Sequence, residues 1–186
     1  DFALSHPPTS PVLLNYGHDF ADFVAGFAPA QSLPYLADMV RLENAQIRAY
    51  HARDAAPILA QVLARVPPER VNGLTFSFHP AAAVVRSAFP IVTIWSMNMG
   101  LSPLAPIAAL KPEDALITRP ELSVLTRQIS AGSAVFLLAL IGGATLGEAF
   151  EAALASDPDF DLGQNLAELM RSGAILDIVA APSLEA

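Results

Sequence analysis

The side chains that could perform chemistry are few, and their spacing fits no familiar metal or catalytic motif. The histidines are His6, His18, His51 and His79, and Asp54 follows His51 at helical spacing. Two histidines brought together could bind a metal ion, but a histidine in a loop or at a helix end is more often an ordinary surface residue. We therefore predict no metal site and no cofactor.

Carboxylates and hydroxyls lead to the same conclusion. Of Asp19, Asp22 and Asp38, two stand where helices are predicted to begin, so capping explains them better than acid–base catalysis. Ser130–Ser133 lacks the Gly-x-Ser-x-Gly turn of a hydrolase nucleophile, and no Lys-Ser or Lys-Thr pair follows Gly142-Gly143 as in a phosphate loop. The absence of cysteine excludes thiol catalysis within this chain. We predict that the chain is not an enzyme.

The composition is that of a globular, acidic chain. Its 186 residues are 53% hydrophobic and 15% charged, enough for one large domain or two small ones. The net charge of −8 lies in residues 113–186, which hold eleven acidic and three basic residues. No apolar run is long enough to span a bilayer, so we expect no membrane partner, and the absence of cysteine suits the cytoplasmic protein that we expect. The sequence opens without Met, on what resembles a helix end before Pro7-Pro8, so we expect a helical region to precede it.

The elements that would position a site are clearest in residues 113–186. Apolar and polar residues alternate in 115–119 and 122–127, as in the strands of a hairpin. Thr145 and Glu148 have the spacing of a capping box, and Asp161 can cap a further helix. Two strands, three helices (131–141, 146–155 and 162–172) and a last strand (174–179) follow the order of a winged helix-turn-helix variant. The predicted core is Leu125, Phe136, Leu137, Leu140, Leu146, Phe150, Leu154, Leu166, Leu169 and Ile175.

The preceding residues are predicted to be helical first and then to include strands. Phe20, Phe23 and Phe27 share one face of a short helix and are interpreted as core residues. A longer helix, from Ser32 or Leu33 to about His51, is expected to bury Leu36, Val40, Ile47 and Tyr50. A helix over 58–66, strands over 74–78 and 84–88, a helix from Pro90 and a loop over 101–112 complete the pattern. We predict an α+β fold with a helical region (1–72), a strand region and linker (73–112) and a winged-helix-like module (113–186).

A winged module can serve two very different functions, and charge helps to separate them. It can lay its third helix in a DNA groove, or bind a peptide as an extra strand beside that helix. The predicted third helix carries Asp161 and Glu168 against Arg171 alone. A duplex-binding module needs several Lys or Arg residues to displace counterions from phosphate. We therefore favour peptide recognition over DNA-binding transcriptional regulation, which remains the alternative, and expect no nucleic acid partner.

Several short phrases, taken together in their order, resemble one family. They are Ser10–Phe20, Leu33–Asp38, Arg41-Leu42-Glu43, Ala49–Ala52, Asp54–Pro57, His79-Pro80, Arg86-Ser87, Ile94-Trp95 and Thr118-Arg119-Pro120. On these phrases the chain resembles, over essentially its whole length, the bacterial BufC/HvfC family, whose members are often labelled as DNA-binding domains. One departure is Asn44, which stands where we expect an aromatic residue.

The resemblance implies a partner role in the biosynthesis of ribosomally made, modified peptides. Family members are typically encoded beside TIM-barrel enzymes that hold two or three iron ions and modify cysteines of a precursor peptide. A related partner protein forms a heterodimer with its enzyme and helps to present the peptide. We expect the same of this chain, with the enzyme held by the helical half. The partner-binding candidates are Tyr16, Phe20, Tyr35, Arg41, Glu43 and Trp95.

The peptide is expected to add to the hairpin, either at 122–127 or at 116–119, beside the third helix. The peptide-binding candidates are Leu122, Val124, Leu162, Asn165, Leu166 and Leu169. Asp161, Glu168 and Asp177 would surround the groove with negative charge, so a peptide with Lys or Arg is expected. A proline at Val124 should block a ladder bond and weaken peptide binding while leaving the enzyme complex intact.

Overall fold

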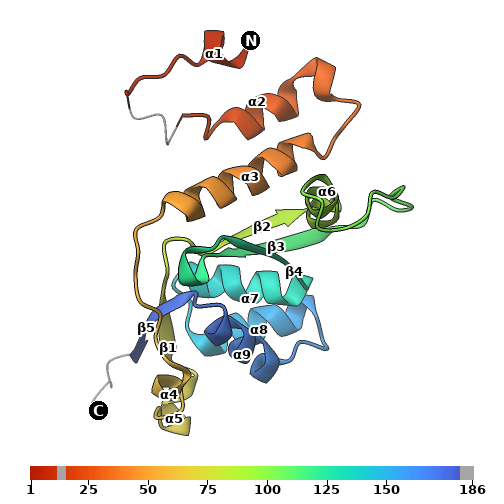
Figure 1. Ribbon diagram of the computed structural model, residues 1–186. Helices are drawn as coiled ribbons and strands as arrows, with labels where there is room; N and C mark the ends of the chain where they lie inside the picture. Colours follow the sequence, from red (N-terminus) through yellow and green to blue (C-terminus); the bar gives the residue numbers. More distant parts are fainter. Residues whose placement is uncertain (12–15, 181–186) are drawn as a thin grey trace.

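A three-stranded antiparallel sheet lies between two layers of helices (Figure 1). The computed structural model describes residues 1–11 and 16–180. Its sheet consists of β2 (Ala83–Ser87), β3 (Glu113–Thr118) and β4 (Leu125–Ile129), in the order β2-β3-β4. Every residue of β3 is buried, because α3 (Leu36–His51) and α6 (Ile91–Asn98) cover one face and α7 (Ala131–Ile141) covers the other. The chain therefore has the α+β fold that the sequence predicts.

A second, two-stranded sheet joins distant parts of the chain. β1 (Leu74–Phe78) pairs antiparallel with β5 (Ile175–Ala180), with Leu74 opposite Ala180. β2 likewise pairs with β3. Each sheet thus pairs a strand that precedes residue 113 with a strand that follows it, across the predicted division of the chain. Residues 181–186, at the end of the predicted module, and 12–15, within the phrase Ser10–Phe20, lie outside the described residues.

The three C-terminal helices begin and end close to where the sequence predicts. α7 is followed by α8 (Leu146–Ser156) and α9 (Leu162–Arg171). The Thr145 hydroxyl accepts from the Glu148 N–H, and the Glu148 carboxylate accepts from the Thr145 N–H, so the capping box is confirmed. The Asp161 carboxylate accepts from the Gln164 N–H at 2.9 Å and caps α9. These are local signals, which explains why the sequence alone locates them.

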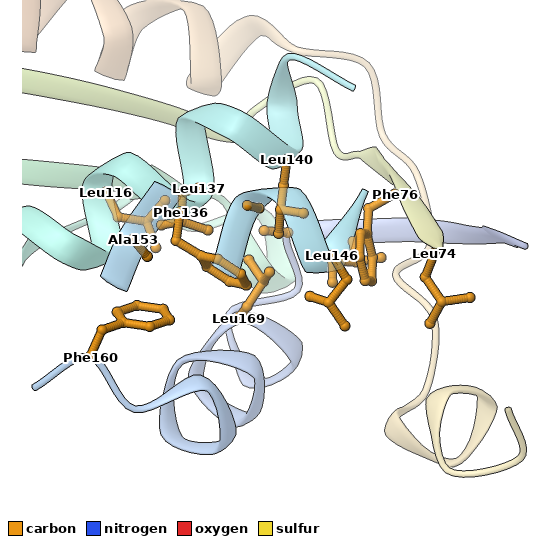
Figure 2. Close-up of a cluster of buried hydrophobic side chains, with 13 residues drawn as sticks. Leu74, Phe76, Leu116, Phe136, Leu137, Leu140, Leu146, Ala153, Phe160 and Leu169 are labelled. Atoms are coloured by element: carbon orange, nitrogen blue, oxygen red, sulfur yellow. The ribbon is translucent and has the colours of Figure 1, made fainter. Parts of the chain in front are cut away.

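The helices α7, α8 and α9 bury a core against both sheets (Figure 2). The predicted core is confirmed for Phe136, Leu137, Leu140, Leu146, Leu169 and Ile175, which are buried. Phe150, Leu154 and Leu166 are partly buried and pack against the same cluster. Leu125 is an error in the prediction, since it is 43% exposed. It is the first residue of the edge strand β4, and no further layer covers it there.

The hairpin is confirmed, but its second strand begins later than predicted. Pro120–Leu122 form a 3₁₀ turn, and β4 starts only at Leu125. Val124 therefore lies before the strand, so the expectation that a proline there would remove a ladder bond is wrong. β3 is the central strand, which also removes 116–119 as a candidate edge. Only β4 of this hairpin keeps an open side among the described residues.

The N-terminal helices form the outer layer of the molecule. α1 (Phe2–Ser5) and α2 (Phe20–Gly26) precede a short 3₁₀ turn, Ala28–Ala30, and then α3.

The predicted helix over 58–66 is shorter, at Ala60–Leu63 (α4), and α5 (Pro68–Val71) follows it. The residues 101–112 form neither helix nor strand, as expected.

The sequence identifies the wrong buried face of α3. Ile47 and Tyr50 are 49% and 65% exposed, whereas the buried residues are Ala37, Met39, Leu42, Ala45 and Ala49. Apart from Ala37, these pack with α6, β2 and β3 in a second core. Alanines let a helix backbone approach a sheet closely, so the small residues face inward and some larger apolar ones remain outside. An apolar periodicity based on side-chain size alone could not show this.

Removing the Phe136 ring should test the C-terminal core. Phe136 is 1% exposed, and its ring centroid lies 5.2 Å from that of Phe160. We expect Phe136→Ala to lower the free energy of unfolding by about 3–5 kcal/mol, measured by chemical denaturation. Leu138→Ala is the matched control on the same helix, because Leu138 is 39% exposed and should cost under about 1 kcal/mol. Equal losses in the two variants would contradict this core.

Candidate functional site

The edge strand β4 presents one face to each layer of helices. The Gln46 amide of α3 donates to the Thr126 hydroxyl at 2.8 Å, so Thr126 faces the α3 layer. Successive side chains of a strand point to opposite faces, which turns Leu125, Arg127 and Ile129 toward α7–α9. The packing of Ile129 against the C-terminal core agrees with this. The same three side chains are the ones that a ligand between β4 and α9 would meet.

The two ends of α9 lie near the two ends of β4, in the opposite order. Near the start of α9, the Asn165 side chain accepts from the hydroxyl of Ser133, which lies just beyond the end of β4. Near its end, Met170 lines the same hollow as Leu122, which lies just before β4. The strand spans about 17 Å and the helix about 15 Å. Each length corresponds to about five extended residues.

The predicted peptide-binding residues are only partly brought together by this arrangement. Leu122 is 68% exposed at one end of the site, and Leu162 and Leu166 are half-buried on α9. Asn165 is already engaged, with Ser133 at 2.5 Å and with the Asp161 carbonyl at 2.8 Å. Leu169 is 2% exposed and belongs to the core, so it cannot line an open groove. Val124 packs against the other core, beside α3 and α6.

The charges around the site are mixed rather than uniformly acidic. Asp161 and Glu168 lie on α9, but Arg127 lies on the facing side of β4 and Arg171 ends the helix. Asp177 lies on β5, which pairs with β1 in the other sheet. This arrangement gives no clear preference for a basic peptide.

A hollow of about 520 Å³ lies at the turn before β4, where sequence reasoning placed no pocket. Segment 54–59, the turn and the end of α9 line it, and Leu122 and Met170 contribute apolar surface. Arg119 forms its polar wall: the guanidinium donates to the Ala52 carbonyl at 2.6 Å and to the Asp54 carboxylate at 2.8 Å. The sequence signals were Thr118-Arg119-Pro120 and Asp54–Pro57, which recur in the resemblance but do not indicate that they meet.

The turn beside this hollow carries two signs of a functional site. Glu121 and Leu122 have φ of 48° and 66°, a left-handed conformation that costs a residue with a Cβ about 1–2 kcal/mol. Strain of this kind often accompanies binding sites. In addition, the Arg119 side chain is 7% exposed, and its Nε has no hydrogen-bond partner among the described residues. An unpaired buried donor is costly, and this one is enclosed by the protein.

His79 is buried against the same segment. Its Nδ1 accepts from the Ala81 N–H at 3.0 Å, and the ring also bonds to the backbone of Ala55. Burial lowers the pKa of His79 below its ordinary 6.5, and the positive charge of Arg119 lowers it further. His79 is therefore a neutral, structural residue near neutral pH. It links segment 52–55 to the end of β1.

The predicted partner-binding residues fall into separate groups. Tyr16 and Phe20, 36% and 38% exposed, each lie near Phe2, with ring centroids 5.8 and 5.1 Å away. Phe20 is exposed, Phe23 and Phe27 are half-buried, and none of the three belongs to either core. The interpretation of these residues as core residues is therefore wrong. Tyr35 and Trp95 are half-buried and pack against the core between α3 and the sheet.

Arg41 mainly holds helices together. Its guanidinium donates to Asp22 at 2.7 Å and to Asp38 at 2.6 Å, and the other Asp38 oxygen accepts from Ser87 at 2.6 Å. α2, α3 and β2 are thereby joined. Both carboxylates raise the pKa of Arg41, with Asp22 the stronger influence. Glu43, by contrast, is exposed on α3.

In the part of the chain that the structure describes, no three His, Asp or Glu side chains are grouped closely enough to hold a metal ion. Within the same residues, no helix has the length and apolar character needed to cross a bilayer.

The low pKa of His79 predicts a pH-dependent loss of stability. Because the folded chain favours the neutral ring, the unfolded chain binds more protons once the pH falls below about 6.5. The free energy of unfolding should therefore have its full value above this pH and decrease below it, as measured by thermal or urea unfolding. His79→Gln should reduce this dependence, whatever its effect at neutral pH. The same slope in both proteins would show that His79 does not contribute.

Comparison with known proteins leaves the site to be judged from its geometry. No family model matches the chain, and no curated protein matches it either. The observations that bear on function are therefore the open edge of β4, the antiparallel α9 beside it and the strained, partly unpaired hollow at one end.

Proposed function

We propose that this protein is a non-catalytic partner protein, which binds a ribosomally made precursor peptide and the multinuclear iron enzyme that modifies it. The observation that carries the peptide part is the open edge of β4 beside α9. A three-stranded sheet followed by three helices offers an extended peptide two things at once. The strand edge supplies main-chain hydrogen bonds, and the helix supplies side-chain contacts.

The peptide would lie antiparallel or parallel to β4 and fill the space toward α9. Half-buried Ile129, Leu162 and Leu166 would receive its apolar side chains, and exposed Leu125 would be covered. Covering exposed leucine would favour binding.

The enzyme part of the proposal is supported by the resemblance and by where its phrases lie. Asp38, Arg41 and Ser87, from three of those phrases, form one hydrogen-bonded group. Asp54 and Arg119, from two others, form a second group. Both groups hold α3 and the segment after it against the sheet. These hydrogen bonds between residues distant in the sequence hold the helical layer in position. We assign the outer surface of this layer to the enzyme.

The geometry of α9 favours a peptide over DNA. A recognition helix needs a basic, exposed face that enters the major groove. α9 carries Arg171 as its one basic residue, together with Glu168, and it packs Leu166 and Leu169 against the core. Its N-terminus is capped by Asp161, which adds a negative charge where phosphate would approach.

Two adjacent proline variants should test peptide addition to β4. In an antiparallel edge strand the N–H groups of successive residues point alternately to the neighbouring strand and outward. One of Thr126→Pro and Arg127→Pro should therefore destabilise the β3–β4 ladder. The other should fold normally but bind the precursor peptide about tenfold more weakly, because it lacks an outward donor.

The test requires a precursor-peptide gene in the neighbourhood of this one, and its product is titrated calorimetrically into the full-length protein. Thr126→Ala and Arg127→Lys are the matched controls, since both keep the N–H and Arg127→Lys also keeps the charge of a side chain that faces the site. They should retain affinity within about threefold of the wild type. Undiminished affinity in the folded proline variant would show that the peptide binds elsewhere.

Duplex DNA should bind weakly or not at all near neutral pH. Residues 113–186 carry eleven acidic and three basic residues, and the chain has a single lysine. Specific DNA-binding proteins usually reach a Kd of about 10⁻⁸ M or tighter at physiological salt. A gel-shift titration of the full-length protein should give no sequence-selective complex at nanomolar concentration. A salt-dependent, selective shift would favour the transcriptional regulator instead.

A further inference from the structure

The chain leaves the fold as a long arm between α6 and β3. Residues 99–112 form neither helix nor strand, and Figure 1 shows them as the green loop that extends past α6. Within the arm, the one backbone hydrogen bond between its own residues joins Lys111 N–H to the Ala109 carbonyl. Loops longer than about 12–15 residues without secondary structure are uncommon in compact domains, and ordered ones are often functional.

Both ends of the arm are held on α6. At the first end, the Ser96 carbonyl accepts from the Leu101 N–H at 2.9 Å, and the hydroxyls of Ser96 and Ser102 lie 3.0 Å apart. At the other end, the buried Glu113 carboxylate accepts from the Thr93 N–H at 2.9 Å and from its hydroxyl at 2.6 Å. The arm therefore projects from a defined base rather than from a mobile connection.

The arm is apolar and exposed, with one charge at its end. Leu101, Leu104 and Leu110 are 68%, 83% and 55% exposed, and Ile107 is 37% exposed. Lys111 is the one charged residue of the segment. Scattered apolar side chains are normal on a protein surface, but a contiguous set usually marks an interaction site. The lack of charge indicates that the complementary surface is also uncharged.

The spacing of these residues indicates the conformation in which they would bind. Leu101, Leu104, Ile107 and Leu110 recur every third residue, and Pro103 and Pro106 have the same spacing. A polyproline-II helix has three residues per turn, so this period aligns the large apolar side chains in one row and the prolines in another. An α-helix or a strand would scatter them over several faces. Pro-x-x-Pro segments in this conformation bind grooves lined by aromatic side chains.

We propose that residues 101–110 are a docking arm, which binds as a polyproline-II segment in an uncharged, aromatic-lined groove of the partner enzyme. This inference rests on the proposed function and adds to it the contact that holds the enzyme. The stiff prolines reduce the conformational entropy lost on binding. The row of leucines and Ile107 supplies the apolar area, and the base on α6 fixes the direction in which the arm leaves the fold.

The test measures the affinity of the full-length protein for a TIM-barrel iron enzyme encoded in its gene neighbourhood, by calorimetry or biolayer interferometry; the absence of such a gene would overturn the proposed function and this inference with it. Leu104→Ser and Leu110→Ser should each weaken the complex by about tenfold or more, because each removes a leucine that the groove of the enzyme would bury. Ala105→Ser and Ala108→Ser, in the same arm but on another row, are the matched controls and should stay within about threefold. A synthetic peptide of residues 99–112 should compete with the complex. The exposure of Leu104 predicts an unchanged Tm for its variant.

The possible outcomes separate this inference from the function on which it rests. If the wild type binds the enzyme and the leucine variants bind equally well, the docking arm is wrong and the proposed function stands. If the wild type does not bind the enzyme, the proposed function fails and the inference fails with it. If the leucine variants instead abolish self-association of the isolated protein in sedimentation experiments, the arm binds a second copy of this chain, which also overturns the assignment.

Discussion

The burial of β3 on both faces is the constraint on which the rest of the structure depends. Alternate residues of this strand enter two different cores: Leu116 joins the α7–α9 cluster, and Ala115 and Ile117 join the α3–α6 cluster. The charged residues at the start of this strand are buried as well and have partners. Glu113 bonds to Thr93 of α6, and Asp114 pairs with Arg86 of β2. These bonds fix α6 and β2 around the strand.

The open edges of the sheet follow from this arrangement. With helices on both faces, the backbone groups still available for another chain lie along the sides of the sheet rather than on its surfaces. β4 is the edge that the three C-terminal helices follow directly, and α9 runs back along it. The proposed peptide site thus arises from the same packing that buries β3. The strained turn and the Arg119 hollow mark one end of that site.

The helical layer and the arm of residues 99–112 differ from each other in what they offer a partner: the charged residue Arg41 of the layer is already paired, whereas the arm is apolar and exposed. Ion pairs of Arg41 with Asp22 and Asp38 tie α2 to α3 and therefore occupy a residue expected to contact a partner. Exposed surface pairs of this kind add little stability individually. The arm at 99–112 instead offers apolar area with a regular spacing. If a partner enzyme binds here, we expect apolar contacts from the arm to contribute more than the charged residues of α3.

The sequence by itself determined the features that depend on neighbouring residues. The caps at Thr145 and Asp161, the bounds of α7 and the alternation in β1 were all predicted, because capping and periodicity are local. The tertiary structure alone decided which segments meet. The pairing of β1 with β5, the inward turn of the α3 alanines, the start of β4 at Leu125 and the contact of Arg119 with Asp54 all join residues whose relation depends on packing. Local pattern carries no information about such contacts, since many partners have the same periodicity and only the shape of the assembled core selects one of them.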